Sequence, residues 1–309
     1  MAGTTAATKV GIIGMGWVGS SVAISTLHAG VARELLLNDL RTEVAEGEAM
    51  DLAQGTAFYP PASVRVASVE EMLETDAVVL AVGNGAMPGG KSRLDQLKQN
   101  ADIVRSLGGK LRGYRGLVIL VTNPVDALTF VMAESTGLPP ERVIGTGTLL
   151  DSARLRQMVG ETLRLDARSV HAHVVGEHGD SEVVLWSTAT VGATPLAAWP
   201  GWNRDDEARI AEQVRTAGYD IVQRKGATNH AIGLVTAHLL RGILRGERQV
   251  LTVSRVQSDV PGFEDVALSL PAVVGADGAT QVVVPEMTPA ERDGLDRSAA
   301  VLREALRSL

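Results

Sequence analysis

The chain has 309 residues, of which 45% are apolar and 21% charged, a composition typical of a globular protein with two domains or one large one. It contains no cysteine, which excludes disulfides, thiolate nucleophiles, cysteine-ligated zinc and iron–sulfur clusters. The net charge is −7 and no basic stripe interrupts it, so we expect no nucleic-acid partner.

In the first half of the chain, short β-branched runs alternate with helical stretches. We predict strands at 9–13, 34–38, 64–67, 77–82, 117–121 and 142–144, and helices at 17–29, 42–54, 94–111 and 125–135. Strands that alternate with helices indicate crossover connections and a parallel sheet with helices on both faces. The predicted fold class is therefore α/β, with an open, doubly wound parallel-sheet domain at 1–147.

The pattern changes in the second half, where several strands are separated by turn residues and not by helices. We predict helices at 149–159, 205–224, 227–245 and 289–306, and strands at 169–175, 182–188, 250–256, 265–274 and 281–284. This arrangement is typical of an antiparallel sheet with helices packed on it. We therefore expect a second, α+β domain at 148–309, with the boundary near Gly147.

A G-x-G-x-x-G pattern directly follows the first predicted strand and opens the first helix. Gly14 permits a tight turn, Gly16 lets the backbone approach a pyrophosphate, and Gly19 lets the helix pack closely on the strand. Asp39 ends the next strand, where a carboxylate binds a ribose diol and repels a 2′-phosphate. We expect a Rossmann-type site that favours NAD, although Arg41 leaves NADP open. The alternative is a glycine turn followed by a solvated aspartate.

Two further segments carry residue types suited to acid–base chemistry. His178 lies in a glycine-rich loop between two predicted strands, and histidine gives and takes protons near neutral pH. Asp151 and Arg154 are three positions apart at the start of a helix, which places them on one face. The alternatives are a surface histidine and an exposed ion pair.

Five motifs occur in order along the chain. They are GMGWVG (14–19), TNPVD (122–126), GTGTLLDSARLR (145–156), VVGEHGDSEVVLWS (174–187), and KGAT (225–228) followed by Ile232-Gly233. With them, nearly the whole chain resembles the L-lactate/malate dehydrogenase family of NAD-dependent L-2-hydroxy acid dehydrogenases. The lactate branch matches better than the malate branch around LLDSARLR and GEHGDSE. The resemblance implies reversible hydride transfer between NADH and a 2-oxo acid.

The resemblance also implies roles for individual residues. His178 would give a proton to the substrate carbonyl, Asp151 would orient its ring, and Arg154 would bind the substrate carboxylate in a two-pronged ion pair. Arg93, on a loop that closes over the substrate, would polarise the carbonyl, and the alternative is a solvated arginine on a surface turn. The implied substrate-binding residues are Arg154, Asn123, Ala86, Met87, Thr228 and Ile232. The implied cofactor-binding residues are Gly14, Met15, Gly16, Trp17, Val18, Gly19, Asp39, Gly83 and Asn123. We expect NAD as the cofactor and no metal.

The loop at 83–93 departs from the family pattern. Lactate dehydrogenases carry a glutamine and malate dehydrogenases an arginine where this chain has Ala86, and one extra residue, Gly90, precedes Arg93. Without that arginine, the second carboxylate of oxaloacetate would be buried unpaired, unless Lys91 turned inward. Ala86 and Met87 favour pyruvate or 2-oxo acids with larger apolar side chains. L-malate dehydrogenase is the alternative, and a non-catalytic NAD-binding sensor is the alternative from another class.

Regulation and assembly are also expected from the resemblance. Arg156 and His171 match positions at which bacterial lactate dehydrogenases bind fructose 1,6-bisphosphate between subunits. An equally weighted account makes them a solvated helix arginine and a strand histidine. Family members pair through helices equivalent to 42–54 and the one after Ala227, so we expect a homodimer or homotetramer. The sequence shows no secretory signal and no apolar run long enough for a membrane span, and we expect a cytoplasmic protein without a membrane partner.

Overall fold

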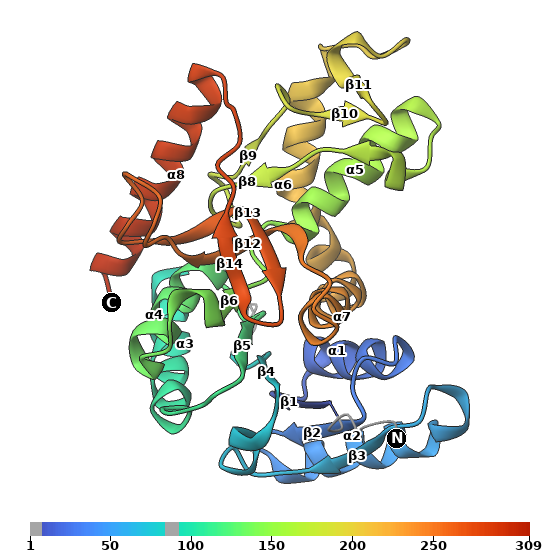
Figure 1. Ribbon diagram of the computed structural model, residues 1–309, viewed down its shortest axis with the longest axis vertical. Helices are drawn as coiled ribbons and strands as arrows, with labels where there is room; N and C mark the ends of the chain where they lie inside the picture. Colours follow the sequence, from blue (N-terminus) through green and yellow to red (C-terminus); the bar gives the residue numbers. More distant parts are fainter. Residues whose placement is uncertain (1–7, 84–92) are drawn as a thin grey trace, which may run out of the picture.

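The computed structural model describes residues 8–83 and 93–309, with the side chains of 93–95 left aside. Its centre is a nine-stranded sheet in the order β14-β13-β12-β6-β5-β4-β1-β2-β3 (Figure 1). The parallel strands are β1 (Lys9–Ile13), β2 (Glu34–Asn38), β3 (Ser63–Val66), β4 (Ala77–Leu80), β5 (Leu117–Leu120) and β6 (Val143–Gly145). The strand order runs outward from the β1/β4 pair in both directions, which confirms the predicted doubly wound arrangement.

Helices cover both faces of the parallel strands, and this explains their apolar composition. Every residue of β4 (AVVL) and β5 (LVIL) is buried, as expected for strands with helices on each side. The covering helices of the first half are α1 (Trp17–His28), α2 (Thr42–Gln54), α3 (Arg93–Lys110) and α4 (Val125–Thr136). α3 and α4 pack together on one face, and α1 lies on the other (Figure 1).

The second half contributes long helices and an antiparallel extension of the same sheet. Its larger elements are α5 (Leu149–Leu163), α6 (Asp206–Lys225), α7 (His230–Leu244), α8 (Pro289–Arg307), β12 (Gln249–Val256), β13 (Ala267–Gly275) and β14 (Gly278–Val282). The predicted antiparallel strands β12, β13 and β14 are present and join the large sheet, while the short strands between α5 and α6 form two small antiparallel sheets of their own. β12 pairs with β6 through Ser254 and Gly145 and so continues the parallel sheet.

The strands predicted at 169–175 and 182–188 are wrong in extent, because only short pieces of each form. The short strands are β7 (Val170–His171), β8 (Val174–Val175), β9 (Val183–Val184), β10 (Thr190–Val191) and β11 (Thr194–Pro195). Side chains of α5 and of its N-cap bind the backbone of β8: the N–H of Val174 donates to Ser152 (2.9 Å), and the Thr148 hydroxyl donates to the Val174 carbonyl (2.6 Å). β10 and β11 form a hairpin that the sequence pattern does not predict.

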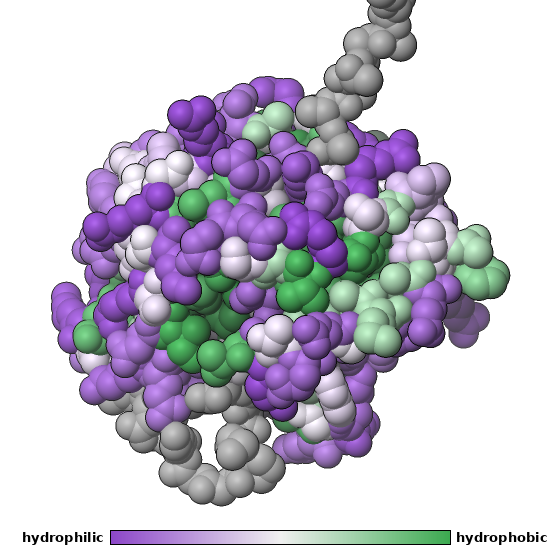
Figure 2. All heavy atoms as spheres, turned by 90° about the horizontal axis from the view of Figure 1, so that it is seen from below, coloured by the Kyte–Doolittle hydropathy of each residue, from purple (hydrophilic) through white to green (hydrophobic). Residues whose placement is uncertain are grey.

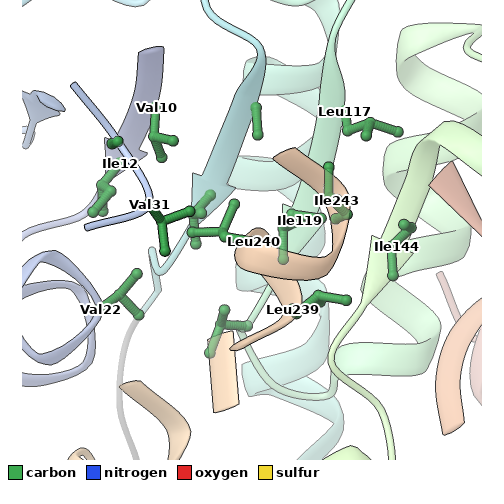
Figure 3. Close-up of a cluster of buried hydrophobic side chains, with 14 of the residues drawn as sticks. Val10, Ile12, Val22, Val31, Leu117, Ile119, Ile144, Leu239, Leu240 and Ile243 are labelled. Carbon is green, nitrogen blue, oxygen red and sulfur yellow. The ribbon is translucent and has the colours of Figure 1, made fainter. Parts of the chain in front are cut away.

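One core cluster joins the two halves of the chain. Leu239, Leu240 and Ile243 of α7 belong to the same buried cluster as Ile12 of β1 and Ile119 of β5 (Figure 3). A helix from the second half therefore covers the sheet of the first. In the part of the chain that the structure describes, no helix is both long and apolar enough to cross a membrane.

Candidate active site

The predicted nucleotide-binding glycines form a tight strand-to-helix turn after β1. Gly14 has a φ of +94°, and a Cβ there would lie 2.5 Å from the carbonyl oxygen of Ala81. A Cβ on Gly19 would lie 1.8 Å from the carbonyl oxygen of Gly14. A Cβ on Gly16, by contrast, would meet no atom of the described residues within 4 Å. The turn thus leaves open space at the N-terminus of α1, where backbone N–H groups attract a phosphate.

Asp39 closes this turn from the end of β2. One carboxylate oxygen accepts a hydrogen bond from the Met15 N–H (2.7 Å), and the other accepts one from the Arg41 N–H (2.9 Å). These bonds fix the carboxylate next to the glycine turn, where the motif requires it. Trp17 is 60% exposed on the first turn of α1, while Val18 packs against the core.

Two more predicted cofactor residues lie at the same edge of the sheet, after β4 and β5. Gly83 has a φ of +131°, and a Cβ there would lie 2.9 Å from the side-chain oxygen of Asn100. The amide of Asn100 donates to the backbone carbonyl of Asn123 (2.9 Å). Asn100 therefore connects the start of the loop at 83–93 to the TNPVD turn.

His178, Asp151 and Arg154 are brought together as the motifs predict. Asp151 Oδ2 lies 2.5 Å from Nδ1 of His178, and Oδ1 accepts a hydrogen bond from Nη1 of Arg154 (2.7 Å). The Asp151 side chain is 2% exposed, that of Arg154 12% and that of His178 26%. Solvent therefore reaches the histidine ring but not the carboxylate beneath it. Nε2 of His178 has no hydrogen-bond partner among the described residues.

The charges of this group favour a protonated histidine. Burial alone would lower the pKa of His178, but the charge and hydrogen bond of Asp151 outweigh it and raise this pKa to about 9. Burial also acts against the ionised form of Asp151, yet the charges of His178 and Arg154 hold its pKa below the ordinary value. The site therefore holds His178 as a protonated imidazole whose ring solvent reaches.

Two buried carboxyls next to His178 were not among the predicted site residues. Asp126, in the first turn of α4, accepts a hydrogen bond from the backbone N–H of His178 (2.7 Å), and burial raises its pKa to about 6. Glu182 has a carboxylate oxygen within 4.8 Å of atoms of both Asp151 and His178. Both residues occur inside quoted motifs, but sequence alone gives no sign that they point at the histidine. The expectation that no metal binds here stays a prediction.

The remaining predicted residues are placed less completely. Thr228 lies in the segment before α7, and Ile232 packs at the edge of the core from the first turn of that helix. Ala86 and Met87 lie outside the described residues, as do Lys91 and Gly90. Arg93 is the first residue of α3, but its side chain is outside the description too. The parts of these residues in a substrate pocket stay predictions.

The same holds for the predicted effector residues, although their charges act on one common neighbour. Arg156 donates from Nε to the carbonyl of Ala172 (3.1 Å), and His171 is exposed on β7. Both act on His173, whose pKa is lowered to about 4 by burial and by the charges of Arg156 and His171. Both residues therefore lie close enough to His173 for their charges to act on it.

Comparison with known proteins agrees with the motifs. Residues 8–145 match the model of the NAD binding domain of lactate/malate dehydrogenases, and residues 148–309 match the model of their alpha/beta C-terminal domain. The chain belongs to the lactate/malate dehydrogenase family. Within this family, the L-lactate dehydrogenase of Thermus aquaticus is 42% identical over 308 residues, covering 97% of this chain and 99% of that protein. The L-lactate dehydrogenase of Kosmotoga olearia is 41% identical over 311 residues, covering 97% of this chain and 96% of the relative.

Solved structures of the family show the same fold. A minor L-lactate dehydrogenase from Enterococcus mundtii has a TM-score of 0.94 and 37% sequence identity, with 98% of each chain covered. A lactate dehydrogenase from a Medee basin deep-sea metagenome library also has a TM-score of 0.94, with 36% identity and 98% of each chain covered. These lactate dehydrogenase neighbours and relatives do not favour the malate alternative.

Proposed function

We propose that this chain is an NAD-dependent L-2-hydroxy acid dehydrogenase of the lactate dehydrogenase type. It would interconvert L-lactate and pyruvate, or the corresponding acids with larger apolar side chains. The observation that carries the proposal is the double contact of Asp151, which binds the ring of His178 on one side and the guanidinium of Arg154 on the other. A non-catalytic sensor would have no need for this buried constellation.

Each of these residues has a task in reducing a 2-oxo acid. His178 donates the proton from Nε2 to the carbonyl oxygen, while Asp151 holds the opposite ring nitrogen and stabilises the imidazolium. One N–H of Arg154 donates to Asp151, and its other N–H groups can donate to the substrate carboxylate. The planar, forked guanidinium suits such a two-point contact. In the reverse direction His178 takes the proton from the alcohol.

The residues around the glycine turn fit a dinucleotide. The open space at Gly16 admits a pyrophosphate, and the fixed carboxylate of Asp39 binds a ribose diol and disfavours the 2′-phosphate of NADP. The bound NADH supplies the hydride. We therefore propose that 1–147 is the dinucleotide unit and 148–309 the substrate unit, with Asn123 and Gly83 at the edge between them.

A steady-state screen tests the function and the substrate class. The chain is assayed with NADH and pyruvate, 2-oxoisocaproate, phenylpyruvate or oxaloacetate, and His178→Asn is the control. We expect turnover of the monocarboxylic acids, with NADH binding retained and turnover lost in the control. A clear preference for oxaloacetate would contradict the role given to Ala86 and Met87, and no turnover of any 2-oxo acid would contradict the function.

We propose fructose 1,6-bisphosphate as an effector at Arg156 and His171. Support comes from the joint action of their charges on His173, since two phosphates would be attracted to such an environment. The test measures the substrate KM and kcat with and without the bisphosphate. An Arg156→Gln variant should lose the response, and an unmodified protein without any response would refute the effector role of both residues.

We also propose a homo-oligomer that pairs through α1, α2 and α7. Apolar side chains gather in patches on the face seen in Figure 2. Independently of that view, the exposed apolar side chains of the three helices include Ile24, Met50 and Leu234. A surface pocket of about 350 Å³ between α1 and α7 is lined by Ile24, Leu234 and His238, among others. Light scattering should give two or four times the 32.5 kDa of the chain. A monomer at assay concentration would refute the proposal.

A further inference from the structure

Glu182 places a second carboxyl beside the histidine ring. It is 8% exposed and directly precedes β9, and its backbone N–H donates to the carbonyl of Gly179 (3.2 Å). One carboxylate oxygen, one ring nitrogen of His178 and one oxygen of Asp151 lie within 4.8 Å of one another. Oε1 of Glu182 is buried and has no hydrogen-bond partner in the part of the chain that the structure describes.

Such a carboxyl is costly to ionise unless cations lie close to it. Burial and the negative charge of Asp151 raise the pKa of Glu182 to about 8. The positive charges of His178, of Arg154 on α5 and of Arg215 on α6 act in the opposite direction.

The charges that face His178 belong to α5, to α4 and to the segment before β9. They are Asp151 and Arg154 on α5, Asp126 on α4, and Glu182 itself. Among the described residues, Oε1 of Glu182 and Oδ1 of Asp126 both lack a hydrogen-bond partner, whereas each oxygen of Asp151 binds a cation. The ionisation of Glu182 is therefore coupled to the protonation of the His178 ring, and the reverse also holds.

We propose that Glu182 is a positioning residue for the dehydrogenase reaction inferred above, whose carboxylate keeps the ring of His178 protonated at alkaline pH. The proposal rests on the proposed function, because the ring is the proton donor there. When Glu182 loses its proton, the new negative charge lies within 4.8 Å of the imidazolium and stabilises it. The protein would thereby reduce 2-oxo acids at a pH where Asp151 alone would no longer hold the proton.

The pH dependence of kcat/KM for 2-oxo acid reduction tests this. In Glu182→Gln the alkaline limb should move down by about one pH unit, because a charge at this distance is lost while the side-chain shape is kept. Glu182→Asp retains the charge, so its alkaline limb should lie close to that of the unmodified protein. Glu161→Gln is the matched control, since it removes a carboxylate from an exposed position on the same helix as Asp151, where Glu161 contacts Gln157. A purely structural role would lower the rate without moving the limb, and that result would overturn the proposal.

A second measurement needs no turnover, and its first part uses the unmodified protein. The His178 ring signal is identified in the NMR spectrum by its absence in His178→Asn, and is followed through a pH titration of the unmodified protein. Coupling to Glu182 predicts two titration steps, which become one step at lower pH in Glu182→Gln. A single step in the unmodified protein would refute the coupling. The titration does not depend on substrate. A protein inactive on 2-oxo acids would therefore refute the proposed function, and the titration would still show whether Glu182 and His178 are coupled.

Discussion

Replacing Asp151 by Asn removes the charge that holds the proton of His178 and keeps the shape of the side chain. Against the effect of burial, Asp151 is the main cause that raises the pKa of the ring from 6.5 to about 9, and the whole shift favours the imidazolium by about 3 kcal/mol. In the variant, burial is opposed only by the weaker charges of Asp126 and Glu182, and the Arg154 guanidinium loses its charged partner next to the ring. We expect the pKa of His178 to fall below 6.5. At about pH 7.5 the protonated fraction would then fall at least about tenfold.

The loss of activity should exceed this fraction, because Asp151 also orients the ring. In histidine–aspartate pairs of this kind, the corresponding change lowers kcat by about 10⁴-fold in a serine protease. The assay follows NADH absorbance during pyruvate reduction from about pH 5 to about pH 9. NADH binding, measured by fluorescence, should be retained because the glycine turn is built by other residues. An alkaline limb at the same pH as in the unmodified protein would refute the reasoning.

Three further predictions follow from contacts described above. A Gly19→Ala variant should fail to fold or to bind NADH, since its Cβ would lie 1.8 Å from the Gly14 oxygen. Gly16→Ala should fold and lose only NADH affinity. Thermal unfolding midpoints and NADH titrations of the two variants check this. Arg154→Lys should raise the KM for pyruvate at least about tenfold, because an ammonium cannot bind a carboxylate in two places; an unchanged KM would contradict that contact. Asp126 has a pKa of about 6 in the fold against an ordinary 3.8, so the stability it contributes is present below 3.8 and is lost as the pH rises through 6. Asp126→Asn should therefore gain about 1 to 3 kcal/mol relative to the unmodified protein between about pH 4 and about pH 7, and an equal difference at both pH values would contradict this.

The sequence predicts the bounds of a strand or helix well where the residues of that element themselves carry the pattern. The strands at 9–13 and 34–38 and the helix at 42–54 have the predicted bounds, because continuous apolar runs and an uninterrupted helical composition mark them. His178, Asp151 and Arg154 could be predicted as a group, because their motifs are specific even though 27 positions separate the first two.

Pairing between segments far apart in the chain cannot be predicted from the residues of one segment. Nothing in 250–256 indicates that this strand joins β6, because the contact is a single pair between Ser254 and Gly145. The side-chain bonds to the Val174 backbone are equally hidden, since they come from a helix more than twenty residues earlier. The direction of Glu182 depends on where its strand begins, and the prediction placed that start one residue too early.

The shared sheet and core have a consequence for how such a protein can be divided. A fragment ending at Gly147 would leave the edge of β6 without β12 and would expose the apolar surface that Leu239, Leu240 and Ile243 cover. Unpaired edges and exposed apolar surfaces promote aggregation. The cofactor-binding half is therefore not expected to fold by itself. A fusion protein that uses it would also have to include α7 and the strands β12 to β14.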